Sequence, residues 1–159
     1  MGSVEINRFL TVMNRKDRKT LFKALKEQFG VNEKLDDVAY LVSNKGKVYC
    51  VTHDIRSLSW ELFRIDRAGV YVGKWLSDGF RPSMEGSKRI GKYASKNIIE
   101  VNKQGVMNWL KGRNIETENK EDGFYIVKYK DDFLGGGKLK NNTLLNGVSK
   151  SRKTTTLIL

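Results

Sequence analysis

The chain has 159 residues, of which 30 are Lys or Arg and 18 are Asp or Glu, so its net charge is +12. This length permits one domain or two small ones, and a hydrophobic content of 39% with a single proline is typical of a folded protein. One Cys and one His exclude a disulfide framework and a zinc cluster built within this chain. A strongly basic chain of this kind is expected to bind phosphates or an acidic membrane surface.

The positive charge is concentrated in the second half of the chain. Residues 1–85 contain 15 basic and 11 acidic side chains, whereas residues 86–159 contain 15 basic and 7 acidic ones. Beyond Asp132 there is no acidic side chain, so the cations that follow have no local counterions in the sequence. We therefore expect the surface that binds an anionic partner to lie in the second half.

Several classes of activity find no support in the sequence. No apolar run of about 18 residues and no secretory leader pattern occurs, which predicts a cytoplasmic protein, nucleolar or nuclear in a eukaryote, with no membrane partner. No phosphate-binding loop or dinucleotide motif follows a predicted strand. Cys50 and nearby His53 could form a nucleophile pair, but a thiol packed within a strand is the favoured interpretation. We expect no catalysis, no cofactor and no metal.

The first half has the pattern of an α/β layer. Asn14 is a predicted helix N-cap and Gly30 a stop signal, with apolar residues on one face between them. Residues 38–42 and 47–52 are β-rich runs separated by a turn sequence, which predicts a hairpin. A short helix is expected from Asp54, followed by another strand. Together these elements predict helices that cover one face of a small antiparallel sheet.

A change of pattern follows Ser77-Asp78-Gly79, which is a strong break, and Pro82 is predicted to begin a short helix that ends near Ile90. We place the boundary between residues 78 and 94, which divides the chain into domains 1–85 and 86–159. The second domain is predicted to contain a strand, one helix and a series of short strands separated by tight turns. Such a series is what a small closed barrel requires, because closure removes exposed strand edges.

The second half contains an ordered series of segments: Ile98-Ile99-Glu100-Val101, the helix with Val106, Trp109 and Leu110, Lys111-Gly112-Arg113-Asn114, residues 122–129, residues 134–138 and residues 145–153. The first of these segments resemble the opening of a PUA domain, and the series as a whole is similar to the PUA-like tail of the Nop/Sun class of RNA cytosine methyltransferases. In that class the last segment usually contains a Pro-Lys pair, whereas Ser149 stands in the place of the proline here.

The first half contains a second ordered pattern, which consists of residues 46–52, the helix expected from Asp54 and residues 70–74. This pattern resembles the α/β domain that precedes PUA in ribosome-biogenesis factors of the Nip-seven type, and residues 80–83 look like the bridge between the two domains. The resemblance implies an α+β protein, with an N-terminal α/β sandwich-like domain followed by a C-terminal PUA-like small β-barrel. It also implies a protein that binds structured RNA, either rRNA or tRNA, in ribosome biogenesis or RNA modification.

The candidate RNA-binding residues are cations and one glycine of the second domain. Residues two apart on a strand point the same way, so the two Lys residues of the strand after Gly137 are expected to share a face and to form one patch with the basic residues near the C-terminus. A glycine after the predicted helix allows close approach of backbone to RNA, although it is equally suited to ending the helix. The candidates are Lys111, Gly112, Arg113, Lys138, Lys140, Lys150, Arg152 and Lys153.

Two segments and the function of the chain each have an alternative interpretation from the sequence. Gly135-Gly136-Gly137 is either a phosphate-binding loop or, by preference, a bulge or bend in the barrel. Residues 154–159 are either a last strand or a disordered tail. The chain could also act chiefly as a protein-interaction module that docks on a ribosome-maturation factor or an RNA methyltransferase, with RNA contact secondary.

Overall fold

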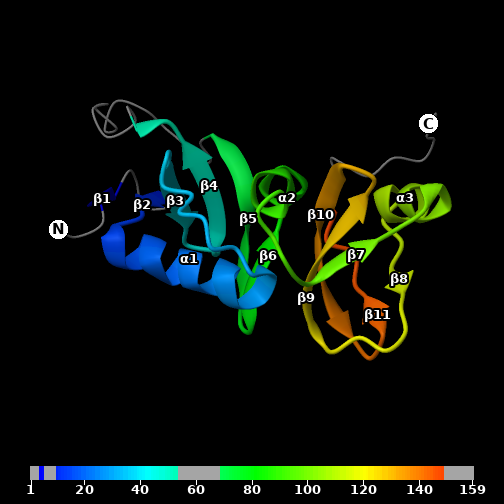
Figure 1. Ribbon diagram of the computed structural model, residues 1–159. Helices are drawn as coiled ribbons and strands as arrows, with labels where there is room; N and C mark the ends of the chain where they lie inside the picture. Colours follow the sequence, from blue (N-terminus) through cyan, green and yellow to red (C-terminus); the bar gives the residue numbers. More distant parts are fainter. Residues whose placement is uncertain (1–3, 6–9, 54–68, 149–159) are drawn as a thin grey trace.

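The computed structural model describes residues 4–5, 10–53 and 69–148, and within them the chain is a mixed α/β protein with two sheets and three helices (Figure 1). The helix expected from Asp54 and the segment 154–159 lie outside the described residues. The first sheet is antiparallel, with the order β1-β2-β3-β4-β5-β6. Its strands are β1 (Val4–Glu5), β2 (Leu10–Val12), β3 (Ala39–Ser43), β4 (Lys47–Val51), β5 (Val70–Leu76) and β6 (Gly79–Pro82).

The second sheet has the order β7-β9-β10-β11-β8, in which β7 is parallel to β9 and the other pairs are antiparallel. Because β7 and β8 both stand at its ends, the sheet is a curled half-barrel in the described residues rather than the closed barrel expected (Figure 1). The elements of this half are β7 (Ile98–Glu100), β8 (Ile115–Glu116), β9 (Gly123–Tyr129), β10 (Asp132–Lys140), β11 (Thr143–Leu144) and α3 (Lys103–Leu110).

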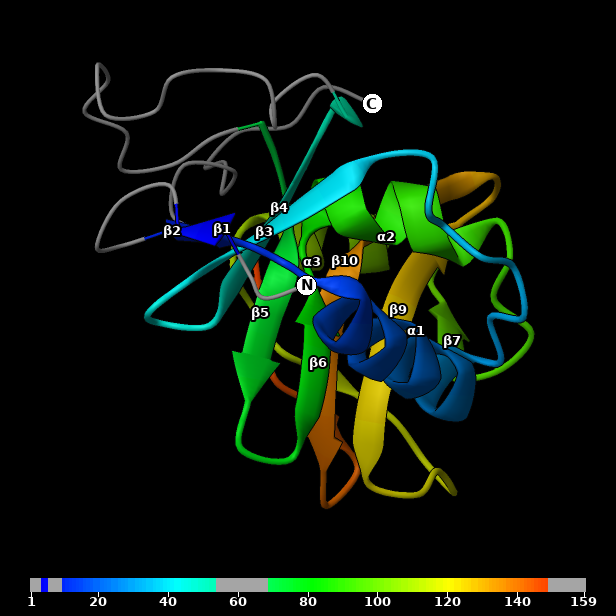
Figure 2. The ribbon, with the colours of Figure 1, turned by 90° about the vertical axis from the view of Figure 1, so that its left-hand side faces the viewer.

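Helix α1 (Arg15–Phe29) begins and ends where the sequence predicts. The Asn14 side chain accepts a hydrogen bond from the Asp17 N–H at 2.8 Å, and the Asp17 carboxylate accepts one from the Asn14 N–H, which completes a capping box. Gly30 ends the helix in the left-handed region with φ of 69°. The helix lies on one side of β5 and β6, as seen in Figure 2, and buries its apolar face against the sheet.

The hairpin predicted from residues 38–52 is confirmed as β3 and β4, but the predicted break at Ser77-Asp78-Gly79 is a tight turn between two paired strands. Residues Gly79–Pro82 form β6 rather than the start of a helix, and α2 (Met84–Gly91) follows Ser83 as its N-cap. A proline is tolerated here because β6 is the edge strand of its sheet. The Gln28 side chain also satisfies this edge, since its amide donates to the Phe80 carbonyl at 2.8 Å and accepts from the Phe80 N–H at 2.9 Å.

Strand β9 is buried on both faces and joins the two halves of the protein. Phe124 and Ile126 belong to the core formed with α1 and the first sheet, whereas Tyr125 and Val127 point into the core of the second sheet around Trp109. This double burial explains why the strand is an unbroken apolar run rather than an alternating one. The two sheets therefore share one core across β9.

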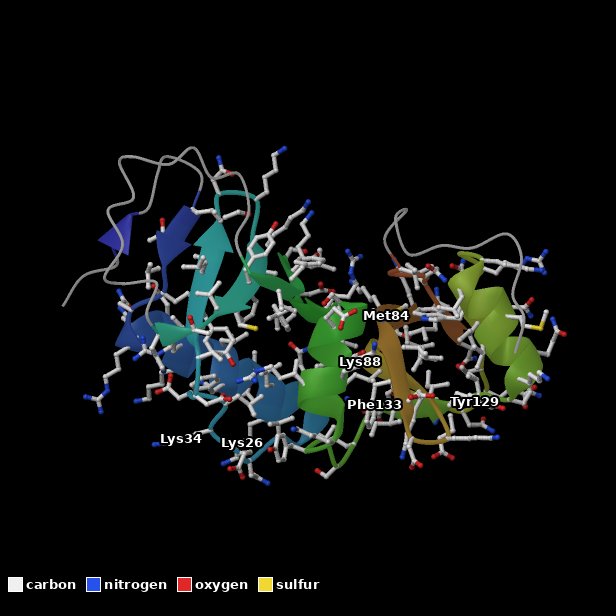
Figure 3. The ribbon with its side chains drawn as sticks, turned by 90° about the horizontal axis from the view of Figure 1, so that it is seen from above. Lys26, Lys34, Met84, Lys88, Tyr129 and Phe133 are labelled. Carbon is white, nitrogen blue, oxygen red and sulfur yellow. The ribbon has the colours of Figure 1, made fainter. Side chains whose placement is uncertain are left out.

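Helix α2 packs against both sheets and uses glycines to approach them closely. A Cβ on Gly86 would overlap the Val72 carbonyl of β5, and one on Gly91 would overlap the Phe133 ring of β10. Figure 3 labels Met84 and Lys88 of α2, and Phe133 of β10, the strand that this helix contacts. The predicted domain boundary falls within this helix, so the division at residues 85 and 86 stays a prediction, while the contacts of α2 connect the sheets on either side of it.

Gly86→Ala tests this close packing, because helix propensity predicts a higher free energy of unfolding for this variant and packing predicts a lower one. Alanine favours a helix by about 0.8–1.0 kcal/mol over glycine, but overpacking of this kind typically costs about 1–3 kcal/mol. We expect Gly86→Ala to lower the free energy of unfolding, measured by urea denaturation, whereas Lys88→Ala on the exposed side of the helix leaves it nearly unchanged. A stabilised Gly86→Ala protein would contradict the packing seen here.

Candidate nucleic-acid interface

The loop after α3 places two of the predicted cations at the surface. Asn102 caps the start of this helix, and the helix ends before Gly112, whose φ of 90° lies in the region that favours glycine. Arg113 is exposed, and its guanidinium donates to the Asn108 side-chain oxygen at 3.1 Å, which leaves its charge uncompensated by that contact. Lys111 is half-buried beside it. The conformation of Gly112 explains how the helix ends and places a residue without a Cβ between two cations.

Asn146 links this loop by hydrogen bonds to the segment that follows β11. Its side-chain amide donates to the Trp109 carbonyl at 2.8 Å and to the Arg113 carbonyl at 2.9 Å. Its backbone N–H donates to the Asn114 side-chain oxygen at 2.9 Å, and its own side-chain oxygen accepts from the Val148 N–H at 2.9 Å. Four hydrogen bonds on one residue hold the loop and the segment 145–148 together. Asn146 is not among the predicted site residues, because no local sequence pattern indicates a bond to residues more than 30 positions away.

The neighbouring Gly147 lies against the first sheet. A Cβ on this glycine would lie 3.0 Å from Cδ and 3.3 Å from Nε of Arg81, and would overlap the Gly136 carbonyl oxygen. The Arg81 side chain therefore packs directly on the segment that Asn146 anchors. As a result, a cation of β6 and the cations of the α3 loop lie on either side of two consecutive residues.

The other predicted cations are placed differently. Lys138 and Lys140 share the outward face of β10, as expected, while Leu139 between them is fully buried. The Lys138 ammonium forms an ion pair with Asp78 in the turn between β5 and β6. Lys140 is exposed at the turn Asn141–Asn142, where both residues have positive φ, as a two-residue hairpin of this kind requires.

The cations expected to form a single patch therefore have different surroundings within the described residues. Thr143, which is paired with Lys140, is three positions before Asn146, a separation of about 10 Å along an extended chain. Lys140 is displaced by that length from the residue that holds the loop 111–113. Lys150, Arg152 and Lys153 lie outside the described residues, so their place in the patch stays a prediction; they follow Val148, which is packed in the second core.

The glycine run 135–137 serves packing rather than anion binding. The β9–β10 register shifts between Phe133 and Gly136, which is the bulge or bend preferred above. The Gly135 N–H donates to the buried Ser87 hydroxyl at 2.7 Å, so this N–H has a partner within the protein. A Cβ on Gly136 would lie 2.8 Å from Pro82 Cδ, which shows how closely β10 meets the first sheet.

Cys50 has the environment of a packed thiol. It is half-buried against the core of α1 and the first sheet, and this burial raises the pKa of its thiol. The ring of His53 is hydrogen-bonded to the Asp36 carbonyl at 3.2 Å through Nε2. Burial thus disfavours the thiolate that a nucleophile needs.

Two properties of the described residues concern membranes and metal ions. None of the described helices is long and apolar enough to cross a membrane. The described parts of the chain also contain no group of three or more His, Cys, Asp or Glu side chains placed to hold a metal ion.

The second sheet, with α3 placed between β7 and β8 in the chain, has the architecture of a PUA-like domain. Residues 96–153 match the family described as the methyltransferase RsmF PUA domain, so this part of the chain is similar to the PUA domain of those rRNA methyltransferases. The resemblance to the Nop/Sun methyltransferase tail is thereby confirmed. The resemblance of the first half to Nip-seven type factors stays a prediction.

Curated relatives extend the similarity into the first half. Ribosomal RNA small subunit methyltransferase F of Vibrio vulnificus strain YJ016 is 22% identical over 137 residues, which are 86% of this chain and 28% of that protein. The enzyme of the same name from Vibrio cholerae strain M66-2 is 22% identical over 138 residues, with the same shares, and that of Vibrio atlanticus strain LGP32 is 25% identical over 89 residues, 55% of this chain and 19% of that protein. The chain thus spans less than a third of the length of these relatives.

The ion pair between Asp78 and Lys138 gives a test of the geometry between the two sheets. Hydrogen bonding to Lys138 holds the pKa of the Asp78 carboxyl below its ordinary value. The ionised Asp78 carboxyl therefore contributes stability at pH values above its unfolded-state pKa, and this contribution is lost as the pH falls through its folded-state pKa. We expect carbon NMR titration to give a lowered pKa for Asp78, and Lys138→Gln to return it toward the ordinary value. Lys140→Gln, on the same face of β10, is the control and should leave the Asp78 titration unchanged; an equal response to both variants would contradict the pairing.

Proposed function

We propose that this chain binds structured RNA, and that it does so in the modification or maturation of ribosomal RNA. The observation that carries the proposal is the cationic loop 111–113, which Asn146 fixes beside the segment 145–148. This arrangement lies entirely within the region that matches the PUA family. Ribosomal RNA is favoured over transfer RNA because the relatives are named as ribosomal RNA small subunit methyltransferases.

The chemistry of the loop suits RNA that is folded. Duplex RNA is recognised mainly through its shape, its 2′-hydroxyls and its phosphates. Arg113 can bind a phosphate through several N–H groups, and Lys111 adds a point charge beside it. Between them, Gly112 has no Cβ to keep the RNA away from the backbone. A fixed backbone therefore allows close approach to the folded RNA, and the two adjacent cations can contact its phosphates.

We further propose that the chain contributes binding and no catalysis. The raised pKa of Cys50 supports this proposal, because a buried thiol is a weak nucleophile at neutral pH. In this proposal the residues of the first half form the pre-PUA domain of the two-domain pattern, and the methyl transfer named for the relatives belongs to other parts of those proteins.

Removing the cations of the loop tests the proposed contact. We expect Lys111→Gln with Arg113→Gln to weaken binding to small-subunit ribosomal RNA, and to reduce the slope of log affinity against log salt by roughly two units, because each duplex phosphate contact adds about 0.9. Fluorescence anisotropy between 50 and 200 mM salt measures both quantities. The matched control is Lys16→Gln with Lys19→Gln, two exposed cations of α1. If both double variants bind as the unchanged protein does, the loop is not the contact.

The basic C-terminal segment requires its own test. We expect Lys150→Glu, Arg152→Glu and Lys153→Glu together to abolish binding to structured RNA, since three positive charges become negative, while the thermal unfolding midpoint stays the same. Electrophoretic mobility shift and circular dichroism supply the two readouts. Unchanged affinity and salt slope would remove this segment from the interface.

The whole proposal fails if the unchanged protein shows no salt-dependent binding to structured RNA. In that case the alternative role, docking on a maturation factor or an RNA-modifying enzyme, gains support from recovery of a protein partner after nuclease treatment. Competition with transfer RNA, at equal nucleotide concentration, separates the two RNA classes.

A further inference from the structure

Three cations lie in a row across the first sheet. In the register of β4 and β5, Lys47 is paired with Lys74, and in the register of β5 and β6, Lys74 is paired with Arg81. Adjacent strands are about 4.8 Å apart, so the three positions span two strand spacings. Like charges placed directly opposite each other on neighbouring strands are destabilising. The basic row, as we call Lys47, Lys74 and Arg81, is therefore costly to the folded protein alone.

The basic row is on the face of the sheet that α1 does not cover. Val48 and Phe80, which are next to Lys47 and Arg81 in the chain, point into the core beneath α1, so the row points the opposite way. Lys47 is exposed, and the other two members are half-buried. Arg81 also reaches the Tyr71 hydroxyl on this face; burial raises the pKa of Tyr71, and the guanidinium opposes part of that rise.

The charges of the row are not neutralised by carboxylates in the described part of the chain. The ion pairs found there involve other cations, and the nearby Asp78 is paired with Lys138. Protection of a sheet edge, a common use of strand lysines, does not explain the row either. Lys47 and Lys74 are on β4 and β5, which are interior strands of the sheet.

The row ends beside the interface described above. Arg81, its last member, packs on Gly147, and the adjacent residue Asn146 bonds to the Arg113 carbonyl. Two consecutive residues thus connect the basic row and the loop 111–113, since Gly147 lies against Arg81 and Asn146 is bonded to the loop. One anionic chain could lie over the loop, cross the segment 145–148 and continue along the row without meeting a described carboxylate from these elements.

We propose that the basic row is a second phosphate-binding surface, on which the first sheet holds the backbone of the same RNA that the loop 111–113 binds. This inference rests on the proposed function and names a surface that the PUA domain does not contain, since residues 47–81 precede the region that matches the family. The ligand is the phosphate backbone rather than the bases, because Tyr49 and Tyr71 of this face pack against each other with ring centroids 5.6 Å apart.

The test compares three variants of the whole chain with small-subunit ribosomal RNA as the probe. The row variant is Lys47→Gln, Lys74→Gln and Arg81→Gln, and the loop variant is Lys111→Gln with Arg113→Gln. The control is Lys16→Gln, Lys19→Gln and Lys26→Gln, which removes the same charge from exposed positions of α1; Figure 3 shows Lys26 on the α1 side of the molecule. Affinity is measured from 50 to 200 mM salt, so that the number of phosphate contacts is read from the slope.

We expect the row variant to bind at least tenfold more weakly than the control at 50 mM salt, with a slope shallower by roughly two to three units. The variant Lys47→Gln with Lys74→Gln, which keeps Arg81 on Gly147, should also bind more weakly, yet unfold at a temperature no lower than the unchanged protein because a like-charge pair is removed. This second variant separates loss of binding from loss of folding.

The outcomes distinguish the two proposals. If the loop variant weakens binding but both row variants match the control in affinity and slope, the second surface is refuted and the proposed function stands. If the unchanged protein itself does not bind RNA in a salt-dependent manner, the proposed function fails first. If the row variant binds short single-stranded and duplex RNA probes more weakly than the control, by the same factor for both probes, the result supports contact with the phosphate backbone. A loss of binding confined to one base sequence would overturn that assignment.

Discussion

Phe124 and Ile126 of β9 pack into the core beneath α1, and this packing fixes how the two sheets lie relative to each other. Full burial of a side chain of this size stabilises a protein by about 1.5–3 kcal/mol. The opposite face of β9 is equally buried in the second core, so the strand cannot leave either sheet without exposing apolar surface. The positions of Arg81 on one sheet and of the loop 111–113 on the other are therefore set by the interior of the protein.

Glycines and one asparagine convert this shared core into a defined surface. Gly86, Gly136 and Gly147 are at points where a Cβ would overlap or crowd the neighbouring backbone, so α2, β10 and the segment 145–148 come closer than other residues would allow. Asn146 then satisfies backbone carbonyls of Trp109 and Arg113. The backbone that carries these cations is therefore ordered before a ligand binds, which lowers the entropy cost of binding.

The local elements were predictable and the long-range ones were not. The capping box of α1, the hairpin of β3 and β4, and α3 followed by Gly112 each have a short signal in the sequence, and all three are confirmed. The strand β6 was missed because Asp78-Gly79 and Pro82 read as a break, and β8 because two residues carry no periodicity. The family resemblance of the second half depended on the order of such segments, and this order can be recognised even where the sequence identity is low.

The candidate site illustrates the same limit, because a charge count gives the number of cations and not their partners. Lys138 had no acidic neighbour along the chain, yet the β5–β6 turn brings Asp78 to it. Lys47, Lys74 and Arg81 are more than 30 residues apart in total, and only the strand register aligns them. If both groups contact phosphates as proposed, selectivity between RNAs would come from the geometry that joins the row to the loop, which suits a folded RNA better than a flexible strand.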